Sequence, residues 1–370
     1  MTRREWIAAI AAVPLVRANE APAAPVSIAR CASYDEDVTA KVGALFDQLG
    51  GLGGLVRNKT VTVKLNMTGP PSSRVQGRAP GLTHYVHPKV IGAVAYHLGR
   101  SGARRVRFVE SAWATAGPLE EVMLDAGWNV RSLQSAAAGM EFENTNALGK
   151  GKTYARFSVP GSPYMYPAYD LNHAFEETDV FVSLAKLKNH DTCGVTLSLK
   201  NCFGSLPASI YGDDAGVDGP NERPTSGRLK VGHEGRRQPA KSAPQELHFG
   251  ANHDPGYRVP RIVADLAAAR PIHLAVVEGV ESIAGGEGPW IGGLRMVKPG
   301  VLVAGLNPVC TDAVAAAVMG YDPRATRGTK PFRQCDNTLL LAEAHGVGTA
   351  DLKRIDVRGV SIKDAIYRYE

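Results

Sequence analysis

Short apolar runs that alternate with segments of helical periodicity restrict the fold of this chain more than any other feature. TVTVKLN (60–66) is rich in β-branched residues, and HPKVIGAVAYHLGRSG (87–102) has apolar residues at helical spacing. ARRVRFVES (103–111) is predicted as the next strand, PLEEVMLDAG (118–127) as a helix and WNVRSLQ (128–134) as a third short strand. This βαβαβ order predicts an α/β fold with a mostly parallel, doubly wound sheet and helices on both faces.

The same pattern resumes in the second half of the chain. Strands are predicted at DVFVSLAKLK (179–188), PIHLAVVEG (271–279) and GVLVAGLNP (300–308). The last of these leads into a helix at TDAVAAAVMG (311–320), which is rich in alanine. We therefore expect both halves of the chain to contribute parallel strands.

Residues 208–256 interrupt this pattern with a segment that is rich in Gly, Pro, Asp and Arg and has little periodicity. About fifty such residues inside a compact domain predict a Gly/Pro-rich, lid-like insertion. We therefore divide the chain into an N-terminal βαβ half (26–178) and a C-terminal α/β half (179–370) that carries the insertion.

The first 25 residues resemble an export signal. An apolar run of about eleven residues follows a charged start, and it is too short to anchor a mature protein in a membrane. Arg3 and Arg4 form a pair typical of twin-arginine signals, and a Sec signal with two chance arginines is the alternative. We predict a signal peptide at 1–25 and a soluble, periplasmic or otherwise exported mature protein without a membrane span.

Composition excludes several classes of partner and cofactor. The formal net charge of +6 is too small to argue for a nucleic-acid partner, and no long basic run supports one. The 5 cysteines are an odd number without C-x-x-C spacing, so the sequence has no zinc ribbon or iron–sulfur cluster motif. The sequence does not decide whether these cysteines are buried free thiols or form a disulfide.

Polar residues follow the predicted strands at their carboxyl ends. In an open parallel sheet these ends lie along one edge, where ligands bind. We therefore expect residues that are far apart in the sequence to converge there, although a chain also becomes polar wherever a strand reaches the surface. The residues are Lys64, Asn66, Glu110, Lys186, Lys188, His190, Glu278, Asn307 and Asp312.

The stretch VSLAKLKNHDTCGVTLSLKNCFGSLP (182–207) places cations in an apolar context. Lysine leaves water reluctantly, so Lys186 and Lys188 either turn to solvent or meet an anion such as a carboxylate or phosphate. In an extended segment both share a side with His190, whose pKa two nearby cations would lower. A neutral His190 could act as a base or bind a metal. The stretch therefore predicts a cationic pocket for a small anionic ligand.

VTLSLKN (195–201) fits either a strand or a helix that ends at Gly204. Thr196 and Lys200 share a face in either structure, so their positions do not decide between a strand and a helix. The residues predicted to bind the substrate or anion are Lys64, Asn66, Glu110, Lys188, Thr196, Lys200 and Asn201.

The Gly-rich stretch EGVESIAGGEGPWIGG (278–293) lacks the phosphate-binding and dinucleotide-binding glycine motifs. Its Glu287, together with Asn307 and Asp312, offers hard oxygen ligands for a divalent metal such as Mg²⁺ or Ca²⁺. A surface turn with an acid near the start of a helix is the alternative. In the insertion, these residues lack regular ligand spacing and are expected on a solvated lid: Asp213, Asp214, Asp218, His233, His248 and His253.

Several of these stretches together resemble the family called domain of unknown function 362, over residues of about 60 to 360. They are VSLAKLKNH, GVTLSLKNCFGSLP, VEGVESIAGGEGPW and AGLNPVCTDAVAAAVMGYDP. Some members of the family carry ferredoxin-like cysteine clusters, so the resemblance implies redox chemistry. This chain lacks the cluster motif, and a redox role would need a partner protein or another cofactor. Besides the strand-end residues above, the resemblance points to Lys200, Asn201 and Glu287.

Two classes of function follow from these features. The first is an exported enzyme, an oxidoreductase or a metal-assisted enzyme, with an anionic substrate or cofactor. We assign catalysis in it to His190, Lys186 and Glu278, with His190 or Glu278 as the proton-transfer group. The second is a noncatalytic carrier that uses the same pocket for an anion or a metal.

Overall fold

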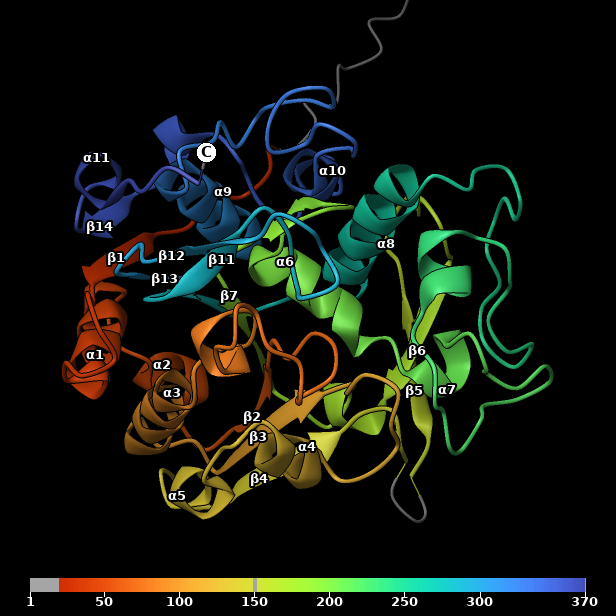
Figure 1. Ribbon diagram of the computed structural model, residues 1–370, viewed down its shortest axis with the longest axis horizontal. Coiled ribbons are helices and arrows are strands. Elements are labelled where there is room, and N and C mark those ends of the chain that lie inside the picture. The colour runs from red at the N-terminus through yellow and green to blue at the C-terminus, as the bar shows by residue number, and fades with distance from the viewer. Residues whose placement is uncertain (1–19, 149–151, 370) are drawn as a thin grey trace, which may run out of the picture.

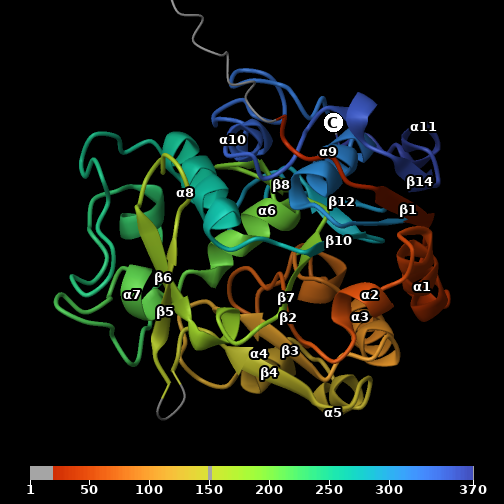
Figure 2. The ribbon, with the colours of Figure 1, turned by 180° about the vertical axis from the view of Figure 1, so that it is seen from behind.

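The computed structural model describes residues 20–148 and 152–369, and within them the chain is built around an eight-stranded sheet (Figures 1 and 2). Strand β13 runs antiparallel to both of its neighbours, whereas the five strands from β10 to β4 are parallel. The expected α/β class and mostly parallel sheet are confirmed, and β13 makes the sheet mixed. From edge to edge the strands are β14 (Val357–Gly359), β1 (Val26–Arg30), β13 (Val301–Gly305), β10 (Leu274–Gly279), β7 (Val180–Lys186), β2 (Thr60–Lys64), β3 (Arg105–Glu110) and β4 (Met140–Asn144).

Three two-stranded ribbons and the α-helices complete the described structure. The ribbons are β5 (Tyr154–Ser158) with β6 (Ala168–Asn172), β8 (Asn189–His190) with β9 (Gly194–Val195), and β11 (Ser282–Ala284) with β12 (Arg295–Val297). The helices are α1 (Val38–Gln48), α2 (Gly53–Val56), α3 (Pro88–Arg100), α4 (Leu119–Asp125), α5 (Val130–Gln134), α6 (Leu197–Asn201), α7 (Ala208–Tyr211), α8 (Pro255–Ala269), α9 (Pro308–Val318), α10 (Thr338–Ala344) and α11 (Ile362–Ala365).

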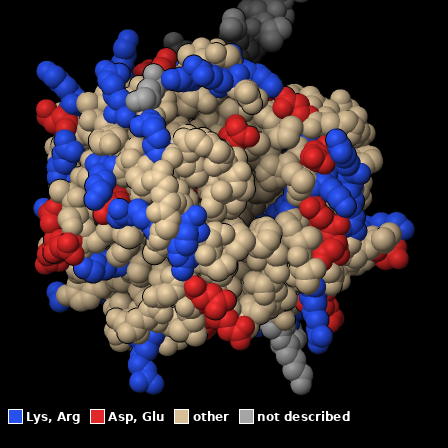
Figure 3. All heavy atoms as spheres, viewed as in Figure 1, with Lys and Arg blue, Asp and Glu red and all other residues tan. Residues whose placement is uncertain are grey.

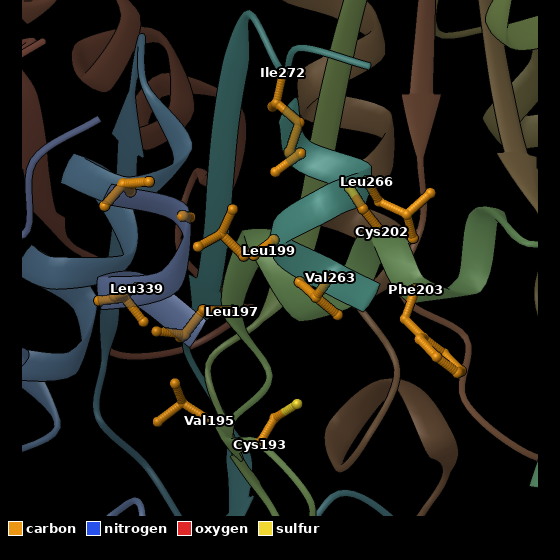
Figure 4. Packing of buried hydrophobic residues seen from close by; sticks show 14 of the residues in the cluster. Cys193, Val195, Leu197, Leu199, Cys202, Phe203, Val263, Leu266, Ile272 and Leu339 are labelled. Atoms are coloured by element: carbon orange, nitrogen blue, oxygen red, sulfur yellow. The ribbon is translucent and has the colours of Figure 1, made fainter. Parts of the chain in front are cut away.

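Alternating side chains of the strands build one hydrophobic core on each face of the sheet. Val61 and Val63 of β2 point to the face that α1 and α3 cover. The opposite face packs against α6, α8 and α9. In Figure 4, Leu199 of α6 lies beside Val263 of α8 in this second core. Because both faces are covered, the central strands are buried along their whole length, as in parallel sheets generally.

The predicted short strand WNVRSLQ is wrong, because this segment forms helix α5. The side chain of Asn129 accepts a hydrogen bond from the backbone N–H of Ser132 and caps the helix. Val130 and Leu133 are both buried, which is the i, i+3 spacing of a helix rather than the alternation of a strand. The third parallel strand is instead β4, which follows a short loop.

In the stretch 195–201, which fitted either structure, residues from Leu197 to Asn201 form the short helix α6, and Val195 ends strand β9. The buried carboxylate of Asp312 accepts hydrogen bonds from the backbone N–H groups of Ser198 and Leu199, at 2.8 Å each. These N–H groups lie in the first turn of α6, where a helix leaves its donors unpaired. A side chain from a distant helix therefore stabilises the start of α6.

Strand β1 lies next to strands from the C-terminal end of the chain. It pairs antiparallel with β13 and parallel with β14. Its register places Val26 opposite both Gly305 and Val357. Strands from the predicted N-terminal and C-terminal halves therefore share one sheet, and the division at residue 178 stays a prediction.

Residues 208–256 contain α7, one turn of π-helix (Leu229–His233) and the first two residues of α8, and their other residues form turns, bends and irregular chain. This insertion is joined to α8 by a buried pair, in which the two guanidinium N–H₂ groups of Arg258 each donate to one carboxylate oxygen of Glu246 at 2.7 Å. Bidentate pairs of this kind fix geometry as well as adding energy. The insertion is therefore held against the rest of the molecule from α8.

The predicted twin-arginine pair and its apolar run lie outside the described residues. Within the described chain, none of the helices has the length and apolar character required to cross a membrane. Figure 3 shows basic and acidic side chains interspersed over the face drawn there.

Candidate functional site

A cavity of about 420 Å³ lies at the carboxyl ends of β2 and β3, enclosed on other sides by α6, the Gly-rich loop 285–294 and the insertion. Eight of the predicted site residues line it, from five separate segments of the chain. They are Lys64, Asn66, Glu110, His190, Thr196, Lys200, Asn201 and Glu287. Of the nine strand-end residues expected to converge, four line this cavity, namely Lys64, Asn66, Glu110 and His190, and five do not, namely Lys186, Lys188, Glu278, Asn307 and Asp312. The expected convergence is therefore met only in part, and the functional roles of the eight lining residues stay predictions.

Lys64 and Glu110 form an ion pair at the inner wall of the cavity. Their charged atoms lie 2.5 Å apart, and both side chains are almost fully buried. Lys64 Nζ also donates to the carbonyl of Leu65, and Glu110 accepts the backbone N–H of Met67. Gly204 leaves the room for this pair, because a Cβ there would lie 2.9 Å from Lys64 Nζ. This cation is therefore already neutralised by the protein.

Lys200 has a different environment on the same cavity. Its ammonium lies 4.5 Å from the centroid of the Phe203 ring, a cation–π contact. Across residues 20–148 and 152–369, no carboxylate forms an ion pair with it. The pKa of Lys200 is lowered because the surrounding protein removes much of its water. Lys200 is a partly buried amine that the described protein leaves without a carboxylate counterion.

Arg228, from the insertion, is a second cation of this kind. Its guanidinium donates to the carbonyls of Leu206 and Ser111 and to Asn146 Oδ1, at 2.5, 3.3 and 3.2 Å. All three acceptors are neutral, and no carboxylate in the described chain pairs with it. Burial lowers the pKa of Arg228 to about 10, so it stays charged at neutral pH.

His190 lines the cavity as a neutral imidazole. Burial, followed by the charge of Lys200, lowers its pKa well below the usual value. The backbone N–H of Thr192 donates to His190 Nδ1 at 3.2 Å, which places the proton of the neutral ring on Nε2. Nε2 makes no hydrogen bond within the described residues. His190 can therefore donate an N–H to a ligand, but it has no free ring nitrogen that could accept a proton.

Glu287 is held in place at the edge of the cavity. It accepts hydrogen bonds from Trp290 Nε1 at 2.8 Å and from the backbone N–H of Asp191 at 3.0 Å. Burial opposes its ionisation, but these donors contribute to a pKa below the ordinary value. Glu287 is therefore an oriented carboxylate at neutral pH.

Lys186 and Glu278, two of the residues predicted to be catalytic, lie apart from this cavity. Their charged atoms are 2.6 Å apart, and both side chains are fully buried. Tyr34 donates to Glu278 at 2.6 Å and accepts from Lys186 at 3.1 Å. By strand alternation this pair lies on the α1 and α3 face, opposite Lys64. Lys186 therefore pairs with a carboxylate of the protein itself. The sequence had left open whether it meets such an anion or turns to solvent.

Lys188 is also fully buried and does not line the cavity. Its ammonium donates to the backbone carbonyls of His84 and Glu287, at 2.7 and 2.9 Å. Burial lowers its pKa to about 7, although the charge of Glu287 opposes this shift. Lys188 therefore ties the Gly-rich loop to the segment before α3.

The three predicted metal ligands have different partners. Asn307 caps α9 by accepting the backbone N–H groups of Val309 and Cys310, and Asp312 caps α6. Of the three, only Glu287 lines the cavity. No group of three or more His, Cys, Asp or Glu side chains is placed to hold a metal ion in the part of the chain that the structure describes. The divalent metal stays a prediction from the sequence.

The sequence did not identify the contribution of the insertion to this cavity. His233, expected on a solvated lid, lines the cavity with an edge-on contact to Phe203 and a pKa that burial lowers to about 4. Arg228 follows Gly227 in a stretch without periodicity, so nothing in the sequence separates it from other arginines of the insertion. Trp113 and Trp290 also line the cavity, and only the position of Trp290 in the Gly-rich stretch gave a signal.

A family model described as "Domain of unknown function (DUF362)" matches residues 61–317. The chain belongs to the DUF362 family. Among curated proteins, this DUF362 member is similar to the thylakoid-associated protein sll1697 of Synechocystis sp., with 26% identity over 187 residues. That match covers 50% of this chain and 51% of the relative, so the chain spans about half the length of the curated relative.

Among solved structures, the chain is similar to a crystal structure of a Thermotoga maritima protein from the Northeast Structural Genomics Consortium. The TM-score is 0.38 at 12% sequence identity. The match covers 73% of this chain and 56% of the other.

Proposed function

We propose that this DUF362 member is an exported enzyme that binds a small organic anion in the cavity beside α6. One observation carries the proposal: Lys200 and Arg228 line one cavity, and neither has a carboxylate partner in the described chain. Other buried cations, such as Lys64 and Arg258, do have one. Because uncompensated buried charge is unfavourable, a cavity with two such cations favours an anionic ligand.

The chemistry proposed for the cavity is charge stabilisation on a bound carboxylate or phosphate. Lys200 and Arg228 would hold the anionic group, and the Nε2–H of His190 would donate to a ligand oxygen. Such donors stabilise negative charge that develops on an oxygen during a reaction. A redox reaction here would need a partner protein or another cofactor, because the sequence has no iron–sulfur cluster motif. Lys186 and Glu278 have no part in this proposal.

The proposal is tested by anion-dependent thermal stability. Phosphate and succinate should raise the Tm of the wild type, because a ligand that binds only the folded state stabilises it. Lys200→Met should weaken this binding roughly tenfold to a hundredfold, as expected for a charge-assisted hydrogen bond. Lys353→Met, which removes an exposed lysine elsewhere, is the control and should respond like the wild type. Equal shifts in all three proteins would refute the anion pocket.

A second measurement separates the enzyme from a carrier. An anion that co-purifies with the protein or raises its Tm is incubated with it, and the solution is followed by NMR. Conversion of the anion by the wild type, with loss of conversion in His190→Ala, supports an enzyme. Recovery of an unchanged anion from a saturated site would support a carrier.

A further inference from the structure

The cavity is larger than a simple inorganic anion requires. Its volume is about 420 Å³, which falls within the roughly 300–1,000 Å³ of pockets that enclose small organic molecules. Lys200 and Arg228 provide charge, but much of the remaining wall is apolar, including Met67, Phe203 and Leu229. The occupant therefore needs an apolar part as well as an anionic group.

Two half-exposed indole rings line the same cavity. Trp113 and Trp290 are each 49% exposed, whereas Trp128, the third tryptophan among the described residues, is buried in the core. Exposed tryptophan that borders a pocket commonly marks a surface that a ligand covers, because the flat ring offers a large apolar area. Both exposed tryptophans of the described chain thus lie where a ligand would contact them.

The ring of Trp290 is fixed before any ligand binds. Its Nε1 donates to Glu287, and the ring lies against Gly69 and Gly288. A Cβ at either glycine would come within 2.3 or 2.4 Å of the ring, so only glycine leaves this space. Gly69 also has a φ of +80°, which side-chain-bearing residues rarely adopt. A preorganised ring binds without first losing rotamer freedom.

The ring of Trp113 packs beside Gly227 of the insertion. A Cβ at Gly227 would meet Trp113 Nε1 at 3.4 Å, and Arg228 is the next residue along the chain. The Phe203 ring lies under the ammonium of Lys200 and adds a further aromatic surface to the cavity wall. Aromatic surfaces and unpaired cations therefore occur side by side in the cavity.

We infer that the ligand of this cavity is a carboxylate or phosphate that carries a planar aromatic or heteroaromatic ring. This inference rests on the proposed anion pocket and narrows its substrate class. The anionic group meets Lys200 and Arg228, and the ring stacks on Trp113 or Trp290. Offset stacking between rings adds to the burial of apolar area, so a planar ring is favoured over a saturated one of the same size.

The test compares ring anions with their saturated counterparts on the full mature protein. The probes are benzoate against cyclohexanecarboxylate and phenyl phosphate against cyclohexyl phosphate, measured by tryptophan fluorescence and calorimetry. We expect the planar member of at least one pair to bind roughly fivefold tighter or more. The two pairs distinguish a carboxylate ligand from a phosphate ligand.

Matched variants locate the ring preference. Because the ring stacks on Trp113 or Trp290, Trp113→Leu or Trp290→Leu should reduce the preference for the planar anion to near unity. Phe249→Leu removes an aromatic side chain that is also 49% exposed but does not line the cavity, and it should keep the preference. A Trp113→Leu protein that retains the full preference would overturn the assignment of Trp113, and the same result in Trp290→Leu would overturn the inference.

The outcomes separate this inference from the proposed function. Equal binding of planar and saturated anions, lost in Lys200→Met, would overturn the aromatic ligand and leave the anion pocket standing. If none of the four probes and no phosphate binds at millimolar concentration, both proposals fail.

Discussion

Lys186 and Lys200 come from the same lysine-rich stretch, yet the structure gives them opposite surroundings. Lys186 is sealed between Glu278 and Tyr34, without exposed area. Lys200 lies over the Phe203 ring on a cavity and has no carboxylate partner in the described chain. Apolar neighbours in the sequence therefore indicate only that a cation is buried. Its partner decides whether it supports the fold or is available to a ligand.

The largest expected effect comes from breaking the sealed pair. Lys186→Met would leave Glu278 buried and unpaired, which should lower the free energy of unfolding by about 3–5 kcal/mol. Urea denaturation measures this loss. The double variant Lys186→Met with Glu278→Leu should recover much of it, because no unpaired charge is left. A single variant within 1 kcal/mol of the wild type would contradict the structural role.

Lys188 sharpens the comparison, because it is buried like Lys186 but lacks an ion pair in the described chain. Its folded pKa of about 7 lies below the ordinary 10.5, so the unfolded chain binds more protons between these values. This residue's contribution to stability should therefore rise with pH, by about 2 kcal/mol between pH 7 and 9.

Urea denaturation of the wild type and Lys188→Met at these two pH values measures the effect as a difference of differences. The free energy of unfolding of the wild type minus that of Lys188→Met should become more positive as the pH rises. A gap that is the same at both pH values would show that Lys188 does not titrate in this range.

A third test concerns Lys64 and Glu110, the paired charges that line the cavity. Gly204→Ala would place a methyl group 2.9 Å from Lys64 Nζ and 3.0 Å from Glu110 Oε1, so the pair must shift. We expect a loss of about 1–3 kcal/mol in the free energy of unfolding, as for overpacking elsewhere. Gly219→Ala is the control, because nothing lies within 4 Å of its added Cβ. Equal stability of the two variants would argue against this tight fit.

The smallest effect on stability is expected at Lys200 itself. Lys200→Met removes a side chain that completes no ion pair in the described chain, so the free energy of unfolding should not fall by more than about 0.5 kcal/mol. Urea denaturation without added anions measures this. Together with a large loss of anion affinity, it would set Lys200 apart from Lys186. A loss of several kcal/mol would instead assign Lys200 to the fold.

Local patterns predicted most of the fold because burial on both faces makes the strands continuous apolar runs. The predicted strand at 128–134 was wrong because helix α5, with five residues, is too short for its period to show in the sequence. The Asn129 side chain caps this helix. The antiparallel direction of β13 was not predictable from composition, since a central strand is apolar in either direction.

The candidate site was predictable where a residue ends a parallel strand, as Lys64, Asn66 and Glu110 do. The sequence could not tell that Lys186 and Glu278 point to the other face, where Tyr34 completes their hydrogen bonds. Arg228 and His233 reach the cavity through an irregular segment, whose path depends on tertiary contacts such as the Arg258–Glu246 pair. Long-range contacts of this kind produce no periodic pattern of residues in the sequence.

The position of β1 has a consequence for the order in which the molecule can assemble. Its neighbours in the sheet come from the far end of the chain, so that the Ser27 hydroxyl donates to the carbonyl of a residue 277 positions later. During synthesis the ribosome releases β1 long before β13 and β14. The edges of β1 therefore stay unpaired until both of these strands have been made, which leaves the growing chain exposed to aggregation and to chaperones.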